Sequence, residues 1–306
     1  MRITTSMVQR NILSDLGSLQ SSLAKTQAKA ASQKEITRPS DDPFKTSQAM
    51  GIRSNIGANE QYIRNIQGAQ GWMDTTESAL DSITQYIHGA QELLIQGSTD
   101  TADATSRKAI AAELDQIIQG IKESANATHG DKYVMSGTET SIAPYALGAD
   151  DGYKGDNNGL SPTVGIVREI GPGVTMSINS VASELLGSGQ GTPGDGKLLN
   201  VLRDISDHLK ANDGAALRGG DNTKLQAQLD VALGVRARNG AQTNRLESAH
   251  TRLDQINGTL TDQLSNTEDA DIAKTMIEFN SQSAAYQAAL RAGANIVQVS
   301  LMDFLR

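Results

Sequence analysis

The chain has 306 residues, which is more than most single hydrophobic cores contain, so its length favours two or more structural units. Aromatic residues make up only 3% of the sequence, which argues against a large aromatic-packed enzyme core, and a formal charge of -8 argues against nucleic acid as a partner. The absence of cysteine excludes disulfides, thiol catalysis and thiolate zinc sites.

The N-terminal segment carries a narrow apolar stripe at helical spacing. Its members are Ile12, Leu16, Leu19 and Leu23, and they follow one another in steps of four, three and four residues. The stripe predicts an amphipathic helix. Apolar residues in the first 17 positions are too scattered for a secretory signal, so ordinary Sec export is not expected, and no run is long enough for a membrane span.

A structural turn is predicted next, at Pro39, Ser40, Asp41, Asp42 and Pro43. Ser and Asp favour caps and turns, and a proline disfavours helical backbone at the residue before it. A catalytic pair is the alternative interpretation of the two adjacent carboxylates. Because carboxylates in such a turn more often cap the following helix, we assign them a structural role.

Two long proline-free stretches, 44–143 and 194–306, predict long helices. In the first, large apolar residues recur in steps of three, four or seven: Ile56, Ile63, Ile66, Met73, Leu80, Ile83, Ile87 and Leu94. A helix from about Thr46 to Gln96 would be about 75 Å long at about 1.5 Å per residue. This length predicts a rod, and the stripe indicates core packing between its helices.

The middle of the chain concentrates glycine and β-branched residues and predicts short strands. Pro172 and Gly173 suit the central positions of a type II turn, so 163–170 and 174–178 are expected to form a hairpin. We expect residues 141–213 to form an insert, and we expect a short linker in place of about 141–212 to preserve the helical rod and its assembly.

Two segments of the insert resemble ligand loops without completing their patterns. Residues 191–197 have the glycine and lysine spacing of a phosphate loop, but Leu198 replaces the Ser or Thr that would hold magnesium. Residues 150–156 lack the ligand spacing and closing Glu of a calcium loop. We interpret the first as a turn before a helix and the second as a solvated turn, and predict no catalytic, cofactor or metal site.

The C-terminal segment matches the N-terminal one. Ser265 and Glu268 have the spacing of a capping box, which predicts that a new helix begins near Thr267. Its apolar stripe includes Met276, Phe279, Tyr286, Leu290, Val297 and Leu301. A lone helix of this size gains little stability without packing, so we expect the two terminal stripes to form a self-assembly seam.

The order of these segments resembles the flagellin superfamily. The resemblance rests on MRITTSMVQRNIL at the start, RPSDDP at 38–43, YVMSGTET from Tyr133, REIGPGVTMSIN from Arg168, RNGAQTNRLE from Arg238, EDADIAKT from Glu268 and AALRAGANIVQVSLMDFL near the end. RPSDDP, the short insert and the ending SLMDFL are most similar to the hook–filament junction branch. Flagellin itself is the alternative, and the apolar seams alone would also allow a non-flagellar soluble coiled-coil binding module.

The resemblance implies a mainly α fold, an elongated antiparallel helical or coiled-coil rod with a small β-rich inserted domain. It implies paired axial helices at 1–40 and 270–306 that depend on assembly. It further implies a helical rod at 41–140 and 214–269, and an outward-facing β-rich insert at 141–213.

The implied function is structural, with no enzymatic activity and no cofactor. Copies of the chain would form a ring in the flagellar axial structure, joining a FlgK-like hook-associated protein to flagellin. The resemblance also implies a FlgN-like export chaperone and export by the flagellar type III system without a cleaved signal peptide. The expected location is the extracellular bacterial flagellum, where the protein serves motility, with no nucleic acid or membrane as partner.

Overall fold

A computed structural model of the chain describes residues 5–148, 150–157, 165–188 and 194–304, with the backbone alone at 5, 6, 8, 9 and 295–304. The chain forms two compact units. The first comprises Met1–Ala58 and Ile256–Arg306, and the second comprises Asn59–Gln255. This division groups 141–213 with the helices around it and places 41–58 beside the terminal segments.

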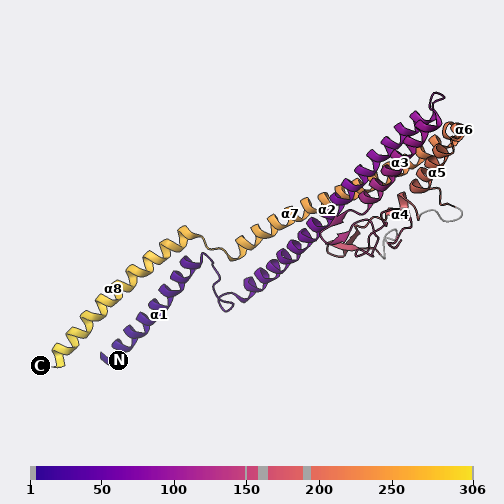
Figure 1. The fold of residues 1–306 in the computed structure, drawn as a ribbon. Coiled ribbons are helices and arrows are strands. Elements are labelled where there is room, and N and C mark those ends of the chain that lie inside the picture. The colour runs from indigo at the N-terminus through magenta and orange to yellow at the C-terminus, as the bar shows by residue number, and fades with distance from the viewer. Residues whose placement is uncertain (1–4, 149, 158–164, 189–193, 305–306) are drawn as a thin grey trace. The chain divides into compact units, whose positions relative to one another are not determined.

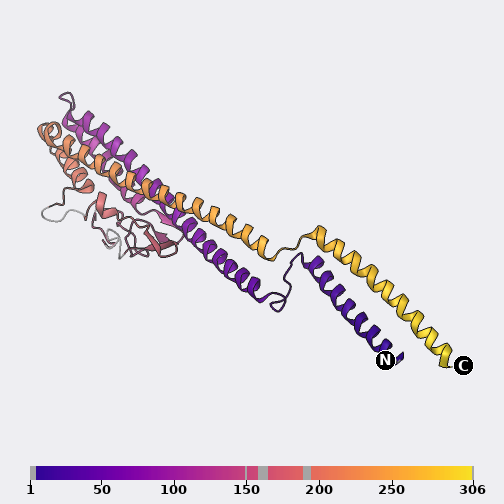
Figure 2. The same cartoon turned by 180° about the vertical axis from the view of Figure 1, so that it is seen from behind.

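The first unit contains a pair of helices from the two ends of the sequence, α1 (Thr5–Ser32) and α8 (Ile272–Phe304). They lie side by side in both views (Figure 1, Figure 2). Ile12 lies against Gly293, and Thr26 Oγ1 donates to Gln282 Oε1 at 2.7 Å, so the two helices run antiparallel.

The break before α8 differs from the predicted one. The preceding helix, α7 (Asn222–Glu268), continues through Thr267, and Ser265 contributes its carbonyl oxygen to the N–H of Asp269 at 2.9 Å. Asp271 caps α8 instead, because its Oδ1 accepts the N–H of Lys274 at 3.1 Å. The predicted capping box at Ser265 and Glu268 was therefore wrong, and the helix begins after Asp271.

The second unit is built on most of α2 (Pro43–Ser98), α3 (Ala104–Ala125) and the first part of α7. Asn239 Nδ2 of α7 donates to the Met73 carbonyl, and Gln91 Nε2 of α2 donates to Gln226, so α2 and α7 are antiparallel. The predicted stripe lies in the core, where the following residues are buried: Ile66, Met73, Leu80, Ile83, Ile87 and Leu94. The prediction of long antiparallel helices is confirmed.

Two small antiparallel sheets complete the architecture. One pairs β1 (Thr128–His129) with β2 (Lys132–Tyr133), and the other pairs β3 (Val167–Gly171) with β4 (Val174–Ser177). Gly173 has φ +67, as the third residue of a type II turn requires. The predicted hairpin is thus present over Val167–Ser177, while the expected strand residues 163 and 164 lie outside the described residues.

The insert contains more helix than expected and shares the core of the second unit. It includes α4 (Ala182–Leu185) and the 13-residue α5 (Leu198–Lys210), and α6 (Gly214–Ala216) and the π-helix η2 (Leu217–Asp221) lead into α7. Apolar residues of α5 pack against α3: Leu198, Leu199, Val201, Leu202, Ile205 and Leu209. Since these side chains join one cluster with those of α2 and α7, the expectation of a removable insert is corrected.

A buried ion cluster fastens the insert to α3. The Lys122 ammonium is fully buried and lies 3.0 Å from Asp151 Oδ1, while Arg203 Nε of α5 donates to Asp151 Oδ2 at 2.7 Å. The interpretation of 150–156 as a solvated turn is therefore wrong for Asp151. Burial alone would raise the pKa of Asp151, but hydrogen bonds from Arg203 and Lys122 outweigh it and hold the pKa below its ordinary value of 3.8.

Asp151→Asn is expected to destabilise the second unit by about 3 kcal/mol, because it leaves the buried Lys122 charge without its carboxylate. Thermal melting should shift downward by about 6–12 °C. Asp150→Asn is the matched control, since its side chain is 60% exposed, and it should melt like the wild type. Equal melting of both variants would contradict the assigned role of Asp151.

The difference in stability between the wild type and Asp151→Asn should also depend on pH. The Asp151 pKa is lowered on folding, so its stabilisation is present above 3.8 and is lost as the pH falls through the folded pKa. The difference in stability between wild type and Asp151→Asn should therefore shrink below pH 3.8. A difference in chemical denaturation that stays constant through this range would contradict the assignment.

Candidate functional site

The predicted assembly seam lies along the facing sides of α1 and α8. Half-buried members on α1 are Ile12, Leu16, Leu19 and Leu23, and those on α8 are Phe279 and Tyr286. Met276 and Leu290 are each 44% exposed, so the pair covers only part of the α8 stripe. Val297 and Leu301 belong to the helical backbone of α8, and their side chains lie outside the described residues.

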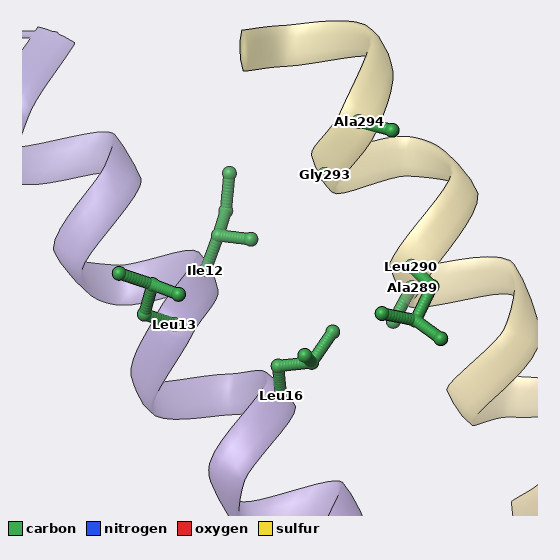
Figure 3. Close-up of a pocket in the computed structure, with 7 residues that line it drawn as sticks. All are labelled: Ile12, Leu13, Leu16, Ala289, Leu290, Gly293 and Ala294. Carbon is green, nitrogen blue, oxygen red and sulfur yellow. The ribbon is translucent and has the colours of Figure 1, made fainter.

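An apolar groove of about 370 Å³ opens between the two helices toward the chain ends. Ile12 and Leu16 project from α1 toward α8 (Figure 3). Opposite them α8 presents mostly small residues, and the full lining is Ile12, Leu13, Leu16, Ala289, Leu290, Gly293 and Ala294. Small residues on one wall leave the large side chains of the other wall without full contact, which explains why the groove stays open.

Gly293 marks a close approach of α8 to α1. A Cβ at this position would lie 3.3 Å from Ile12 Cγ2, which is tighter than ordinary van der Waals contact. A side chain at 293 would therefore require the Ile12 side chain to shift, and glycine allows the two helices to approach closely without such a shift.

Other large apolar side chains of the pair are exposed to solvent, including Leu13, which also lines the groove. Met7 and Leu13 of α1 are 53% and 69% exposed, and Ile272 and Ile277 of α8 are 52% and 70% exposed. Two helices can cover only one side of each other, so a pair with apolar residues on further sides leaves them in water. Exposed apolar surface of this kind marks an interaction surface.

One polar contact lies within the seam. Thr26 is 5% exposed, and its hydroxyl lies 2.7 Å from Gln282 Oε1 and 3.1 Å from the Ser22 carbonyl. A buried polar group loses its hydrogen bonds when the helices slide past each other. Thr26 and Gln282 therefore favour one register of α1 against α8.

The predicted structural turn joins α1 to α2. Asp42 Oδ1 accepts the N–H of Lys45 at 3.0 Å and so caps α2, whose first residue is Pro43. Asp41 Oδ2 accepts from the Thr37 hydroxyl at 3.0 Å and the Arg38 N–H at 2.9 Å, and these bonds lower its pKa. Pro39 and Ser40 are exposed residues of this turn, directly before Asp41. Both carboxylates thus bond to nearby backbone.

Sequence reasoning missed the ionic partners of this region. Glu268 was interpreted as half of a capping box, whereas its carboxylate is buried and contacts Lys34 and Arg53. The partners lie far away in the sequence, and no spacing pattern connects them. For Lys122 a signal existed, because this lysine occupies the same helical face as Ile118 and Ala125, which are buried.

Metal and membrane functions find no support in the described residues. Within them, no three His, Asp or Glu side chains are grouped so that they could hold a metal ion. None of the helices in the described ranges is long and apolar enough to cross a bilayer.

Known protein families match both ends of the sequence. The bacterial flagellin N-terminal helical region matches residues 3–140, and the bacterial flagellin C-terminal helical region matches residues 225–305. The chain belongs to the bacterial flagellin family. The flagellin regions contain α1, α8 and the seam between them, whereas the insert at 141–213 lies outside both matches.

Relatives of this flagellin-family chain extend over its whole length. It is 27% identical to the flagellar hook-associated protein 3 of Salmonella typhimurium, with 100% of both chains covered. It is 26% identical to the protein of the same name in Escherichia coli, with 99% of each covered. It is 28% identical to the flagellin of Bacillus subtilis, again with 100% of both covered. The chain is therefore a structural component of the bacterial flagellum.

Solved structures show the same fold. A putative flagellar hook-associated protein from Vibrio parahaemolyticus has a TM-score of 0.65 at 20% identity and covers 75% of this chain and 100% of its own. FlgL from Bacillus cereus has a TM-score of 0.57 at 20% identity and covers 70% of this chain and 99% of its own.

Pairing of α1 with α8 can be tested by an engineered disulfide, because the chain has no cysteine of its own. Ile12→Cys with Gly293→Cys should crosslink within one chain under mild oxidation, because a Cβ at 293 would lie 3.3 Å from Ile12 Cγ2, a position that the sulfur of a cysteine at 12 can occupy. Asn11→Cys with Gly293→Cys is the control, because position 11 is turned about 100° around the helix. Equal yields, or crosslinked dimers alone, would contradict the pairing.

Proposed function

We propose that the chain is the subunit of the hook–filament junction, forming a ring that joins a FlgK-like hook-associated protein to flagellin. The observation that carries the proposal is the match to hook-associated protein 3 of Salmonella typhimurium and Escherichia coli over essentially the whole of each chain. The role is mechanical, so the chain is no enzyme and uses no cofactor.

The filament subunit is a second candidate, because Bacillus subtilis flagellin matches over the same length at 28% identity. RPSDDP at 38–43 and the ending SLMDFL favour the junction over the filament. A non-flagellar coiled-coil binding module no longer competes, since it does not account for the flagellin-family regions at both ends.

Assembly would use the α1–α8 pair. Its groove and its exposed residues, such as Leu13 and Ile277, leave apolar surface that neighbouring copies in a ring can cover. We therefore propose that residues 1–40 and 270–306 are axial and reach full stability on assembly. In this account 41–140 and 214–269 form the surrounding helical part, and 141–213 faces outward while keeping its core contacts.

The same exposed surface requires protection before assembly. A FlgN-like chaperone that covers the terminal stripes in the cell would serve this purpose. Export would follow through the flagellar type III system, without a cleaved signal peptide, to an extracellular place in the flagellum. A net charge of -8 disfavours binding to the phosphates of nucleic acid, and we expect neither nucleic acid nor membrane as a partner.

Deletion of the gene separates the two candidates. A junction subunit is not the filament material, so the deletion strain should build hooks, export flagellin and lose it to the medium. If the chain is the filament subunit, the medium of the deletion strain should instead lack the filament protein.

Leu290→Asp is expected to reproduce the deletion phenotype, because a carboxylate in the assembled apolar seam would cost about 3 kcal/mol or more. Purified protein should keep the wild-type melting of the second unit, since Leu290 belongs to the first. Ala292→Asp, an exposed neighbour in α8, is the control for charge alone. Normal filaments with Leu290→Asp, or equal loss with both variants, would refute the seam.

A further inference from the structure

The helices of the first unit are interrupted at two places, and the two interruptions pair with each other. One lies between α1 and α2 at 33–42, and the other lies between α7 and α8 at 269–271. The Glu35 N–H donates to the Glu268 carbonyl at 2.7 Å, and the Ala270 N–H donates to the Gln33 carbonyl at 2.9 Å. The bonds form an isolated antiparallel bridge between segments from opposite ends of the sequence.

The Glu268 side chain joins three segments at this point. Its carboxylate is 7% exposed; Oε1 lies 2.6 Å from Lys34 Nζ of the first interruption, and Oε2 lies 2.5 Å from Arg53 Nη2 of α2. Lys34 Nζ also lies 2.6 Å from Asp269 Oδ1. One carboxylate at the end of α7 thus contacts both the α1–α2 connection and the second helix of the chain.

Two physical effects oppose a charge at this place. Glu268 is the last residue of α7, where the helix dipole disfavours an anion, and its burial removes water from the carboxylate. Burial would raise the Glu268 pKa, but hydrogen bonds from Lys34 and Arg53 outweigh it and lower the pKa. The ionised form of Glu268 therefore depends on Lys34 and Arg53, and its carboxylate in turn positions these two side chains.

The backbone at this joint is also strained. Gln33 has φ +58, in the left-handed region of backbone conformation that residues other than glycine rarely adopt. Such a conformation persists only where surrounding contacts maintain it. The Gln33 carbonyl receives the Ala270 N–H, so the strained residue is itself one half of the bridge.

We propose that Glu268 is a positioning residue that latches the two interruptions together. Within the first unit, the latch sets the direction of the α1–α8 pair relative to residues 43–58 of α2 and 256–268 of α7. The proposal deepens the proposed function and rests on it, because copies in a ring must present their axial pairs in one common direction. The latch acts through Lys34 of the α1–α2 connection and Arg53 of α2.

Amide hydrogen exchange of the purified full chain tests the latch. Glu268→Gln keeps the size of the side chain and removes its charge, and it should speed exchange over residues 33–37 and 268–271 by roughly tenfold. Glu247→Gln makes the same charge change at an exposed position of α7 and should leave this exchange unchanged. Equal exchange at the joint in both variants would overturn the proposal.

A double-mutant cycle separates a latch from a set of independent contacts. Arg53→Gln alone should also speed exchange at the joint, but it should add little in the Glu268→Gln background, because the partner is already gone. Additive effects would overturn the latch. The second unit should melt normally in every variant, and a general loss of folding would overturn the local role.

These measurements use the isolated protein and do not depend on where it acts. If exchange responds as expected while the deletion strain behaves like a filament mutant, the latch stands and the junction proposal fails. If exchange does not respond while the deletion strain sheds flagellin, the latch fails and the junction proposal stands.

Discussion

A helix with one narrow apolar stripe is stable only when another surface covers that stripe, and in this chain the two ends of the sequence cover each other. Ile12 of α1 lies against Gly293 of α8, and Leu16, Leu19 and Leu23 continue the same stripe along α1. Because the helices are antiparallel, the interruption after α1 comes to lie beside the one before α8. The joint at Glu268 and the groove near Gly293 both follow from this pairing.

The pairing is incomplete, and under the proposed function the apolar surface that it leaves uncovered serves assembly. A single partner helix can cover one side of α1, so Leu13 and Ile277 remain in water and Leu290 is half covered. A globular protein would bury such residues with a third layer. A flagellin-family subunit can leave them for its neighbours, and small residues on α8 keep space open for their side chains.

Buried carboxylates with two cations secure the fold at two separate places. Asp151 receives Lys122 from α3 and Arg203 from α5, and Glu268 receives Lys34 and Arg53. In each case one acidic group draws together segments that the apolar stripes alone would not align. Hydrophobic burial is the main favourable term in folding, and removing either carboxylate would leave its cations without their partner.

Local and periodic features were the most predictable. The proline-free stretch and its stripe predicted α2, and Pro172 with Gly173 predicted the β3–β4 hairpin. A helix was expected after the glycine-rich segment 191–197, and α5 begins there at Leu198, but no sequence feature showed that it packs into the core of the second unit. The start of α8 was misplaced because Asp271, and not Ser265, caps this helix. Ion pairs such as Lys34 with Glu268 depend on the tertiary fold, so no periodic pattern in the sequence predicts them.

We propose that the terminal helices pair and assemble at the junction between hook and filament. Cryo-microscopy of isolated hook–filament junctions at side-chain resolution can test this proposal. We expect a ring of this chain at the junction, with α1 and α8 paired around the axis and the groove at Leu290 filled by a neighbouring copy. A map that places the chain along the filament, or shows its terminal helices separated within the ring, would refute the proposal.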